Sequence, residues 1–522
     1  MTSPAPAGAT GNATLKGMAP PAAADGPHDL RLPDGFRVVL DRRARRIDGG
    51  EALLGGAPPR LVHLSPTARD LLPAGPRTAL TVTDPTTRAL ARRLLDSGLA
   101  HPVFPDAGKE GEEVPGAEDV TVVVPVKDRS LLRLLATLPA NVGGLVVVDD
   151  GSDDPGTVAA GVVAAGGTVV RHERPRGPAA ARNAGVAAAR TPFVVFLDSD
   201  VVPEPGWLAP LLAHAADPAV AMVAPRIVAL GPVSDGGGAR GAIARYEAVR
   251  SSLDLGPDPA LIVPRSRVAY VPSAAMLVRV DAVSGSGADG RERIAFDEGM
   301  HVAEDVDLVL RLHAAGWRMR YEPTARVAHD HRTDPSEWLA RKAFYGTGAA
   351  PLAQRHPGAV PPVVLSPWSA AVCVLLLLQR RWSVAGAAVV TAVATERLSR
   401  KLTRLDRPRL SAARLTALGL SGAVWQVGSA LTRHFWPVVA LALPFSSRAR
   451  RAVAAAALAE GIADWWVHRD RDPAARPGPV GFLVAHRLDD LAYGAGLWWG
   501  ALRRRTTAPL RPTGPGTAPK QK

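Results

Sequence analysis

Residues 120–200 alternate short apolar runs with helical segments, and this alternation constrains the fold more than any other feature of the chain. Four runs rich in β-branched residues are typical of strands: VTVVVPV, GGLVVVDD, TVVRHERP and PFVVFLDSD. The segments between them have helical composition, and the last one carries Pro178 at its first turn. Strands that are apolar on both faces must be covered on both faces. The pattern therefore predicts an α/β domain with a parallel sheet between layers of helices.

Acidic residues follow three of the expected strands: Asp128 the first, Asp149 and Asp150 the second, Asp198 and Asp200 the fourth. The carboxyl ends of parallel strands meet at one edge, where such sheets bind ligands. Carboxylates gathered there repel one another unless a cation or a hydrogen-bonding ligand relieves the charge. Mg2+ or Mn2+ binds one or two carboxylates and takes diphosphate oxygens as further ligands. The strand ends thus predict a site for a divalent metal and a nucleoside diphosphate.

Three other classes of protein share parts of this pattern. Haloacid-type phosphatases also place D-x-D at a strand end, but they need a downstream Lys and a second acidic metal cluster. Lys342 is the only lysine between residues 201 and 358, and no such cluster follows. Sugar nucleotidyltransferases should carry a Gly-rich basic loop after the first strand, whereas VKDRS contains no Gly. A non-catalytic nucleotide-sugar-binding module would not need all the acids that are present.

Six motifs, in order, carry a resemblance to a known family: VVPVKDRS, VVVDDGSDD, RGPAAARNAG, FLDSD, AEDVDLVLRLHAAGWRMRYEP and RVAHDHR. Over about residues 119–357 the chain resembles the family 2 inverting glycosyltransferases, whose GT-A fold is a Rossmann-like nucleotide-sugar-binding domain. The resemblance implies Mg2+ or Mn2+ as cofactor. It assigns Pro125, Asp128 and Asp150 to the nucleoside, Arg182 to the donor, Asp198 and Asp200 to the metal and donor motif, His329 to the metal, and Asp305 to the catalytic base.

One motif of this family's processive members is missing. EWLARKAFYGTG (337–348) stands where the processive synthases have QxxRW. The difference argues against long processive polymerisation.

A narrower resemblance extends over the whole chain. The order of a small N-terminal module, a transferase and a basic apolar tail is similar to the mycofactocin-system glycosyltransferases of actinobacteria, as are YGTG and HRLDDLAYGAGLWWGALRRR. It implies β-linked transfer of glucose from UDP-glucose onto a small peptide-derived redox cofactor or its growing oligosaccharide. The alternative acceptor is a cell-envelope polysaccharide or glycolipid. We expect residues 230–277 to build the acceptor side, with Tyr246 and Tyr270 as candidate sugar platforms.

Composition divides the remainder of the chain. The expected segments are a disordered leader (1–28), a small winged-helix-like module (29–105), a linker (106–118), the GT-A domain (119–358), a basic apolar helical region (359–510) and a disordered tail (511–522). In the N-terminal module we expect one short helix capped by Ser65 and a second with Pro85 in its first turn. A single cysteine, Cys373, excludes a disulfide within the chain.

The C-terminal region is both apolar and basic. From residue 359 onward the chain carries 23 Lys and Arg against 8 Asp and Glu, a net charge of +15, while the first 358 residues are near −2. Its apolar segments are mostly shorter than the roughly 20 residues of a membrane span. We therefore predict membrane association, through embedded hairpins or interfacial helices as readily as spans, on the cytoplasmic face. A soluble Ala-rich bundle is the alternative. Nucleic acid is not an expected partner, because no aromatic-interleaved basic groove accompanies the arginines.

Overall fold

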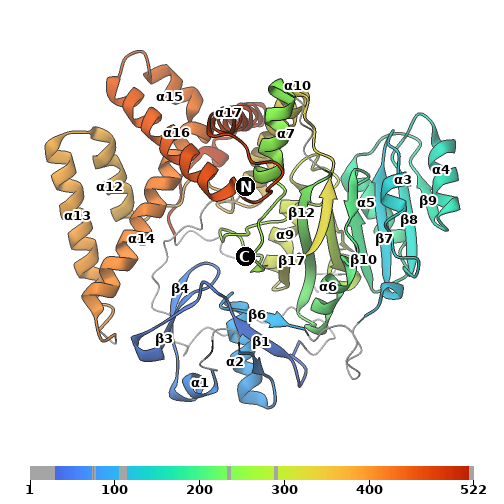
Figure 1. The fold of residues 1–522 in the computed structure, drawn as a ribbon, viewed down its shortest axis with the longest axis horizontal. Helices are drawn as coiled ribbons and strands as arrows, with labels where there is room; N and C mark the ends of the chain where they lie inside the picture. The colour runs from blue at the N-terminus through green and yellow to red at the C-terminus, as the bar shows by residue number, and fades with distance from the viewer. Residues whose placement is uncertain are drawn as a thin grey trace.

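The computed structural model of the 522-residue chain describes residues 30–72, 75, 78–104, 115–231, 237–286, 292–403 and 405–515. The expected leader lies outside the described residues, as do most of the expected linker and tail. Figure 1 shows three regions: a small N-terminal module, a central sheet with its helices, and a helical C-terminal region.

The N-terminal module contains two three-stranded antiparallel sheets and two helices. Their bounds are β1 (Arg37–Leu40), β5 (Leu80–Thr81) and β6 (Ala100–Val103) in one sheet, β2 (Arg45–Ile47), β3 (Ala52–Gly55) and β4 (Arg60–His63) in the other, and helices α1 (Pro66–Leu71) and α2 (Pro85–Asp96). Both predicted helix starts are confirmed: Ser65 Oγ accepts the Ala68 N–H at 3.1 Å, and Pro85 occupies the first turn of α2. The winged-helix resemblance is not confirmed by this arrangement.

The central sheet has nine strands. Its order is β11 (Val201–Pro203), β17 (Arg318–His329), β12 (Val220–Ala229), β14 (Ala275–Arg279), β10 (Phe193–Leu197), β7 (Val120–Val126), β8 (Gly144–Asp149) and β9 (Thr168–Arg171), with β13 (Ala260–Leu261) paired to β17. The four predicted strands are β7, β8, β9 and β10, and they pair in parallel. The prediction of a parallel sheet is confirmed for this half, while β14 runs antiparallel between β10 and β12.

Helices and short strands complete this α/β region. They are α3 (Leu132–Leu135), α4 (Pro155–Ala164), α5 (Pro178–Ala188), α6 (Leu208–Ala213), α7 (Gly238–Arg250), α8 (Val280–Val283), β15 (Gly285–Ser286), β16 (Glu292–Arg293), α9 (Glu304–Ala314), α10 (Pro335–Thr347) and α11 (Ala349–Arg355). Two apolar clusters pack on opposite faces of the sheet, because alternate residues of one strand point to opposite faces: Val123 belongs to one and Val122 to the other. Because β10, β7 and β8 are neighbours that pair in parallel, their carboxyl ends lie together at one edge of the sheet.

The C-terminal region is mostly helical in its described part. It comprises α12 (Pro367–Leu378), α13 (Arg381–Ser399), α14 (Pro408–Ser429), a π-helical turn η4 (Ala430–His434), α15 (Trp436–Ala442), α16 (Ser447–His468) and α17 (Pro479–Arg503). Within the described ranges, no helix combines the length and the apolar character that crossing a bilayer requires. The predicted association through interfacial helices stays a prediction.

The helical region is built onto the sheet region through close backbone contact between α10 and α17. A Cβ added to Gly346 would lie 2.1 Å from the Tyr493 carbonyl oxygen, and one added to Gly496 would lie 1.8 Å from the Ala343 carbonyl oxygen. Only glycine permits such an approach. The glycines of the YGTG and YGAG motifs thus bring α17 against the sheet region.

Candidate active site

One cavity of about 850 Å³ lies beyond the carboxyl ends of β7, β8 and β10. Most of the residues that the family resemblance assigns to the donor site line it: Pro125, Asp150, Arg182, Asp198, Asp200, Asp305 and His329. They come from four strand ends and the starts of two helices. The crevice predicted from the acidic strand ends is thus present as a single space.

Asp128 is the exception, because it does not line this cavity. Its backbone has φ 51°, in the left-handed region, and its N–H donates to Ser152 Oγ at 3.0 Å. Its own Oδ1 accepts the Asp153 N–H at 2.7 Å. Asp128 therefore joins the loops after β7 and β8, and its contacts in this structure are to the protein.

Asp150 holds the loop that leads into α5. Its Oδ1 lies 2.8 Å from His172 Nδ1 and accepts the Arg176 N–H, and its Oδ2 accepts the Gly177 N–H, both at 2.8 Å. Gly177 has φ 93°, which favours glycine. The side chain lines the cavity while it orders this turn.

Arg182 compensates the first aspartate of the DSD motif. It comes from α5, is 3% exposed, and donates from Nη2 to Asp198 Oδ1 at 2.6 Å and from Nη1 to Glu304 Oε1 at 2.9 Å. Burial raises the pKa of Asp198, and the Arg182 charge opposes that rise. The buried Arg182 guanidinium therefore offsets the repulsion expected between Asp198 and Asp200 by neutralising the charge of Asp198.

Asp200 and His329 are brought together by strand register. β11 pairs antiparallel with β17 so that Val201 lies opposite His329, and the Asp330 N–H donates to the Asp200 carbonyl at 3.0 Å. As a result His329 Nε2 lies 3.6 Å from Asp200 Oδ1. Arg129 Nη1 lies 3.2 Å from Asp200 Oδ2.

This pair fits a divalent cation. An aspartate oxygen and an imidazole nitrogen 3.6 Å apart are ligands that Mn2+ accepts, and Mg2+ also binds through one or two carboxylates. The described residues offer no group of three protein ligands here, since Asp198 is turned to Arg182. A cation bound by Asp200 and His329 would need additional ligands, which diphosphate oxygens supply.

Asp305 lies in the first turn of α9. Its Oδ2 accepts the Ser273 N–H at 3.1 Å and its Oδ1 accepts the Val306 N–H at 2.7 Å. Burial, followed by the charge of Glu304, raises the pKa of Asp305 to about 7. A carboxylate with a pKa near neutrality is suited to accept a proton at physiological pH. Ala303, which precedes the helix, has φ 65°, and such backbone strain is often found at functional sites.

The cavity also contains residues that the sequence did not assign. Glu304, the first residue of α9, binds Arg182 and lies within 3.5 Å of Ser273 Oγ. The C-terminal region contributes several wall residues: Arg433, His434, Asp489, Tyr493 and Leu497. Charged residues inside the apolar segment HRLDDLAYGAGLWWG were the available signal for α17, because acids inside a helix that is otherwise apolar are seldom buried without a role.

The two candidate sugar platforms have different fates. Tyr270 lines the cavity. Tyr246 is 1% exposed and packs with ring centroids 6.0 Å from Trp338 and 5.2 Å from Phe482. Tyr246 is therefore a core residue, and its assignment as a platform is wrong.

Comparison with known proteins identifies the transferase class. The sequence profile of glycosyl transferase family 2 matches residues 121–252, and that of glycosyl transferase family group 2 matches residues 193–434. The pre-mycofactocin glycosyltransferase of Mycobacterium tuberculosis, in strains H37Rv and CDC 1551, is 46% identical over 488 residues, which cover 92% of this chain and 98% of that protein.

Solved structures show more distant likeness. The mannosyltransferase of Pyrobaculum calidifontis in complex with GDP-Man and Mn2+ is 19% identical, with a TM-score of 0.34, over 61% of this chain and 91% of that one. Glucosyl-3-phosphoglycerate synthase of Mycobacterium tuberculosis is 22% identical, with a TM-score of 0.30, over 45% of this chain and 79% of that one. At these TM-scores the likeness carries no conclusion.

Proposed function

This chain belongs to glycosyl transferase family 2 and is a glycosyltransferase, and we propose that it is metal-dependent and inverting. The observation that supports the proposal is the single cavity that holds a base candidate, Asp305, together with a cation-binding pair, Asp200 and His329. Direct displacement at the sugar needs both: relief of the leaving diphosphate's charge on one side and proton removal from the acceptor on the other.

We propose pre-mycofactocin as the acceptor and UDP-glucose as the donor, with a β linkage in the product. The proposed acceptor is supported by the name of the 46% identical relative, which aligns over 92% of this chain. An α-linked donor that is displaced in line gives a β-glycoside.

The roles of the residues follow from their surroundings. Asp200 and His329 would hold Mg2+ or Mn2+, which when bound supplies positive charge for the diphosphate. Asp305 accepts the proton of the attacking hydroxyl, and the Ser273 and Val306 N–H groups fix the direction of its carboxylate. Arg182 keeps Asp198 in place at the donor side. Pro125 and Asp150 lie where the nucleoside would bind, while Asp128 would act by ordering the adjoining loops.

We propose that the acceptor's body extends into a second cavity of about 1040 Å³, which shares Ser266, Val364 and Gln426 with the first. Its walls come from the N-terminal module, from the β13 segment and from α13 and α14. Trp368 lies in this wall and offers an aromatic face for a sugar or an aromatic aglycone. Trp368→Ala should raise the KM for the acceptor. The rate of donor hydrolysis measured without acceptor should not change.

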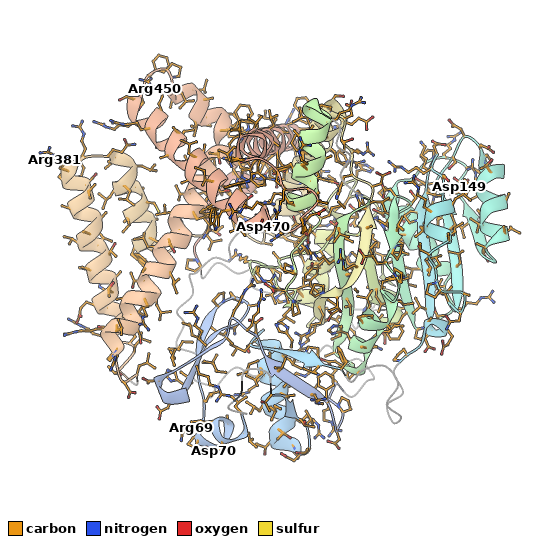
Figure 2. All side chains as sticks on the ribbon, viewed as in Figure 1. Arg69, Asp70, Asp149, Arg381, Arg450 and Asp470 are labelled. Carbon is orange, nitrogen blue, oxygen red and sulfur yellow. The ribbon has the colours of Figure 1, made fainter. Side chains whose placement is uncertain are left out.

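We also propose that the helical region lies on the cytoplasmic face of the membrane without spanning it. Large apolar side chains are highly exposed where α13 begins and α15 ends: Trp382 is 64%, Leu441 74% and Phe445 91% exposed. Arginines accompany them; Figure 2 shows Arg381 and Arg450 at the same edge of the region. Gln379, between α12 and α13, connects to the start of α16 because its Nε2 donates to the Arg448 carbonyl at 2.9 Å. Apolar anchors next to arginines are typical of interfacial helices.

Two experiments test the proposal. Purified protein is incubated with Mn2+ or Mg2+, a panel of nucleotide sugars, and pre-mycofactocin present or omitted, while nucleotide release and product mass are followed. We expect a product that has gained one hexose, and nucleotide release from UDP-glucose that the acceptor stimulates. Full activity in excess chelator contradicts the metal role.

A vesicle-binding experiment tests the membrane proposal. The double substitution Trp382→Ser/Phe445→Ser should release the protein from phosphatidylglycerol vesicles, whereas Leu132→Ser should not, although Leu132 on α3 is 73% exposed. A wild type that does not sediment with the vesicles contradicts the membrane proposal.

A further inference from the structure

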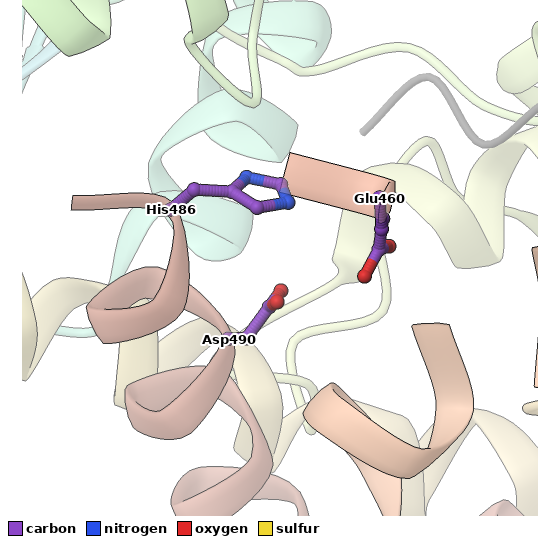
Figure 3. A group of neighbouring side chains, drawn as sticks. All are labelled: Glu460, His486 and Asp490. Carbon is purple, nitrogen blue, oxygen red and sulfur yellow. The ribbon is translucent and has the colours of Figure 1, made fainter. Parts of the chain in front are cut away.

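A group of three ligand side chains lies apart from the transfer cavity, between α16 and α17. Glu460 comes from α16, and His486 and Asp490 come from successive turns of α17 (Figure 3). One ligand atom of each lies within 4.8 Å of the other two, and all three side chains are buried. In the part of the chain that the structure describes, no other group of three His, Cys, Asp or Glu side chains gathers in this way.

His486 is held in the orientation of a metal ligand. The residue is 5% exposed and its Nε2 has no hydrogen-bond partner. Figure 3 shows a ring nitrogen on the side of Glu460 and Asp490. The other nitrogen, Nδ1, is hydrogen-bonded to the Tyr246 hydroxyl at 3.2 Å and lies 3.5 Å from Asp464 Oδ2. Metal-binding histidines are commonly held through their second ring nitrogen by an oxygen of a neighbouring group.

The buried charges around this group are not balanced. A chain of ion pairs joins four carboxylates to three basic side chains among the described residues: Glu247, Glu460, Asp489 and Asp490, with Lys342, Arg433 and Arg487. The chain therefore contains one more carboxyl group than basic side chains. Buried charge of one sign is costly unless a counter-charge accompanies it.

We propose that Glu460, His486 and Asp490 bind one divalent transition-metal ion that links α16 to α17. One imidazole and two carboxylates form a borderline ligand set that suits Zn2+ or Mn2+ better than Ca2+. Ligands of a four-coordinate ion with bonds of about 2.1 Å are about 3.4 Å apart, so modest side-chain rotation brings the three atoms into place. This site is distinct from Asp200 and His329.

Arg487 would be the competitor of the ion. Its Nη1 lies 3.1 Å from Glu460 Oε2 and its Nη2 lies 3.1 Å from Asp490 Oδ2, so it now spans the two carboxylates. Its side chain is 22% exposed, which allows the guanidinium to turn toward solvent. Arg433 would stay, since it binds Asp490 Oδ1 at 2.7 Å from the other side. When a divalent metal ion displaces Arg487 from the two carboxylates, two positive charges replace one.

The consequence would be structural. Asp489 and Tyr493, which line the transfer cavity, are on the same helix as His486 and Asp490. An ion that fixes α17 to α16 therefore fixes this part of the cavity wall.

The test counts bound metal by equilibrium dialysis against Zn2+ and elemental analysis, using full-length Asp200→Asn/His329→Gln protein so that the transfer site contributes nothing. About one equivalent should remain bound, and His486→Gln in this background should bring it to none. His468→Gln is the matched control, because His468 is equally buried, also contacts Asp464, and belongs to no ligand group within the described residues. It should keep the metal.

Two further measurements guard against a variant that fails to fold. Co2+ in place of Zn2+ should give visible absorption bands in the background protein, and Asp490→Asn should weaken or abolish them. Arg487→Met, which removes the competitor, should bind Zn2+ more tightly. Absence of bound metal in the background protein, retention of metal by His486→Gln, or weaker binding by Arg487→Met would overturn the proposal.

Discussion

Replacing the carboxyl of Asp305 with an amide separates proton transfer from donor binding. Asp305→Asn keeps the size of the side chain and one oxygen for the Ser273 or Val306 N–H, but removes the proton acceptor. A positioned general base contributes about 10²–10⁴ in rate. We expect kcat to fall by that factor while the KM for the donor changes little, because the cation-binding residues Asp200 and His329 and the donor-side Arg182 are unchanged.

The raised pKa gives this substitution a second signature, in stability. Burial and then Glu304 raise the pKa of Asp305 from 3.8 to about 7. Between these values the folded state holds a proton that the unfolded chain has released, so folding stability falls as pH rises through this window. At about 1.36 kcal/mol per pKa unit the loss by pH 8 is at most about 4 kcal/mol. The asparagine variant has no such charge, so its stability relative to wild type should rise over the same window.

Two assays decide the matter. Initial rates of UDP release with acceptor, measured from about pH 5 to pH 9, should rise through about pH 7 in wild type and lose that rise in Asp305→Asn. Thermal melts over the same range should show the stability difference. Asp307→Asn is the control: its carboxylate is bound by Arg311 and His356, so it should lower the melting temperature without removing the rise in rate. A collapse of donor affinity in Asp305→Asn would refute the assignment.

Three other predictions follow from the contacts. His329→Gln should raise the Mn2+ concentration for half-maximal activity, whereas His313→Gln, on the far end of α9, should not; metal titration of turnover checks this. Arg182→Lys cannot bridge Asp198 and Glu304 at once, and should lower turnover and the melting temperature together. Asp489→Ala removes one of the carboxylates that bind the buried Lys342 and Arg433, and should cost about 3–5 kcal/mol in denaturant unfolding.

The strands and the acids at their ends were predictable because they depend on local pattern. A β-branched run such as 120–126 has few alternatives to a buried strand, and the acids that follow must lie at the sheet edge. The pairing of Asp200 with His329 was accessible only through family resemblance. It depends on the register of β11 against β17, which joins residues over 120 positions apart along the chain.

The parts that could not be predicted depend on the partner of a side chain rather than on its type. Tyr246 has the composition of a sugar platform, yet it lies under Trp338 and Phe482, residues that no spacing relates to it. Glu304 has the position of an ordinary first-turn acid, yet it binds Arg182 and lines the cavity. Both outcomes are set by packing between segments that are distant in sequence.

The helical region is better understood as part of the transfer site than as an anchor added to it. The boundary expected at residue 358 separates residues that share one core: Ile243 and Trp338 before it pack with Phe482 after it. Buried Lys342 from α10 binds Asp489 from α17 at 3.3 Å, and Asp489 lines the cavity. Removal of the chain after 358 would expose that core and leave Lys342 with one of its two carboxylates. A chain shortened there should therefore lose activity through its cavity wall even under conditions where no membrane is present.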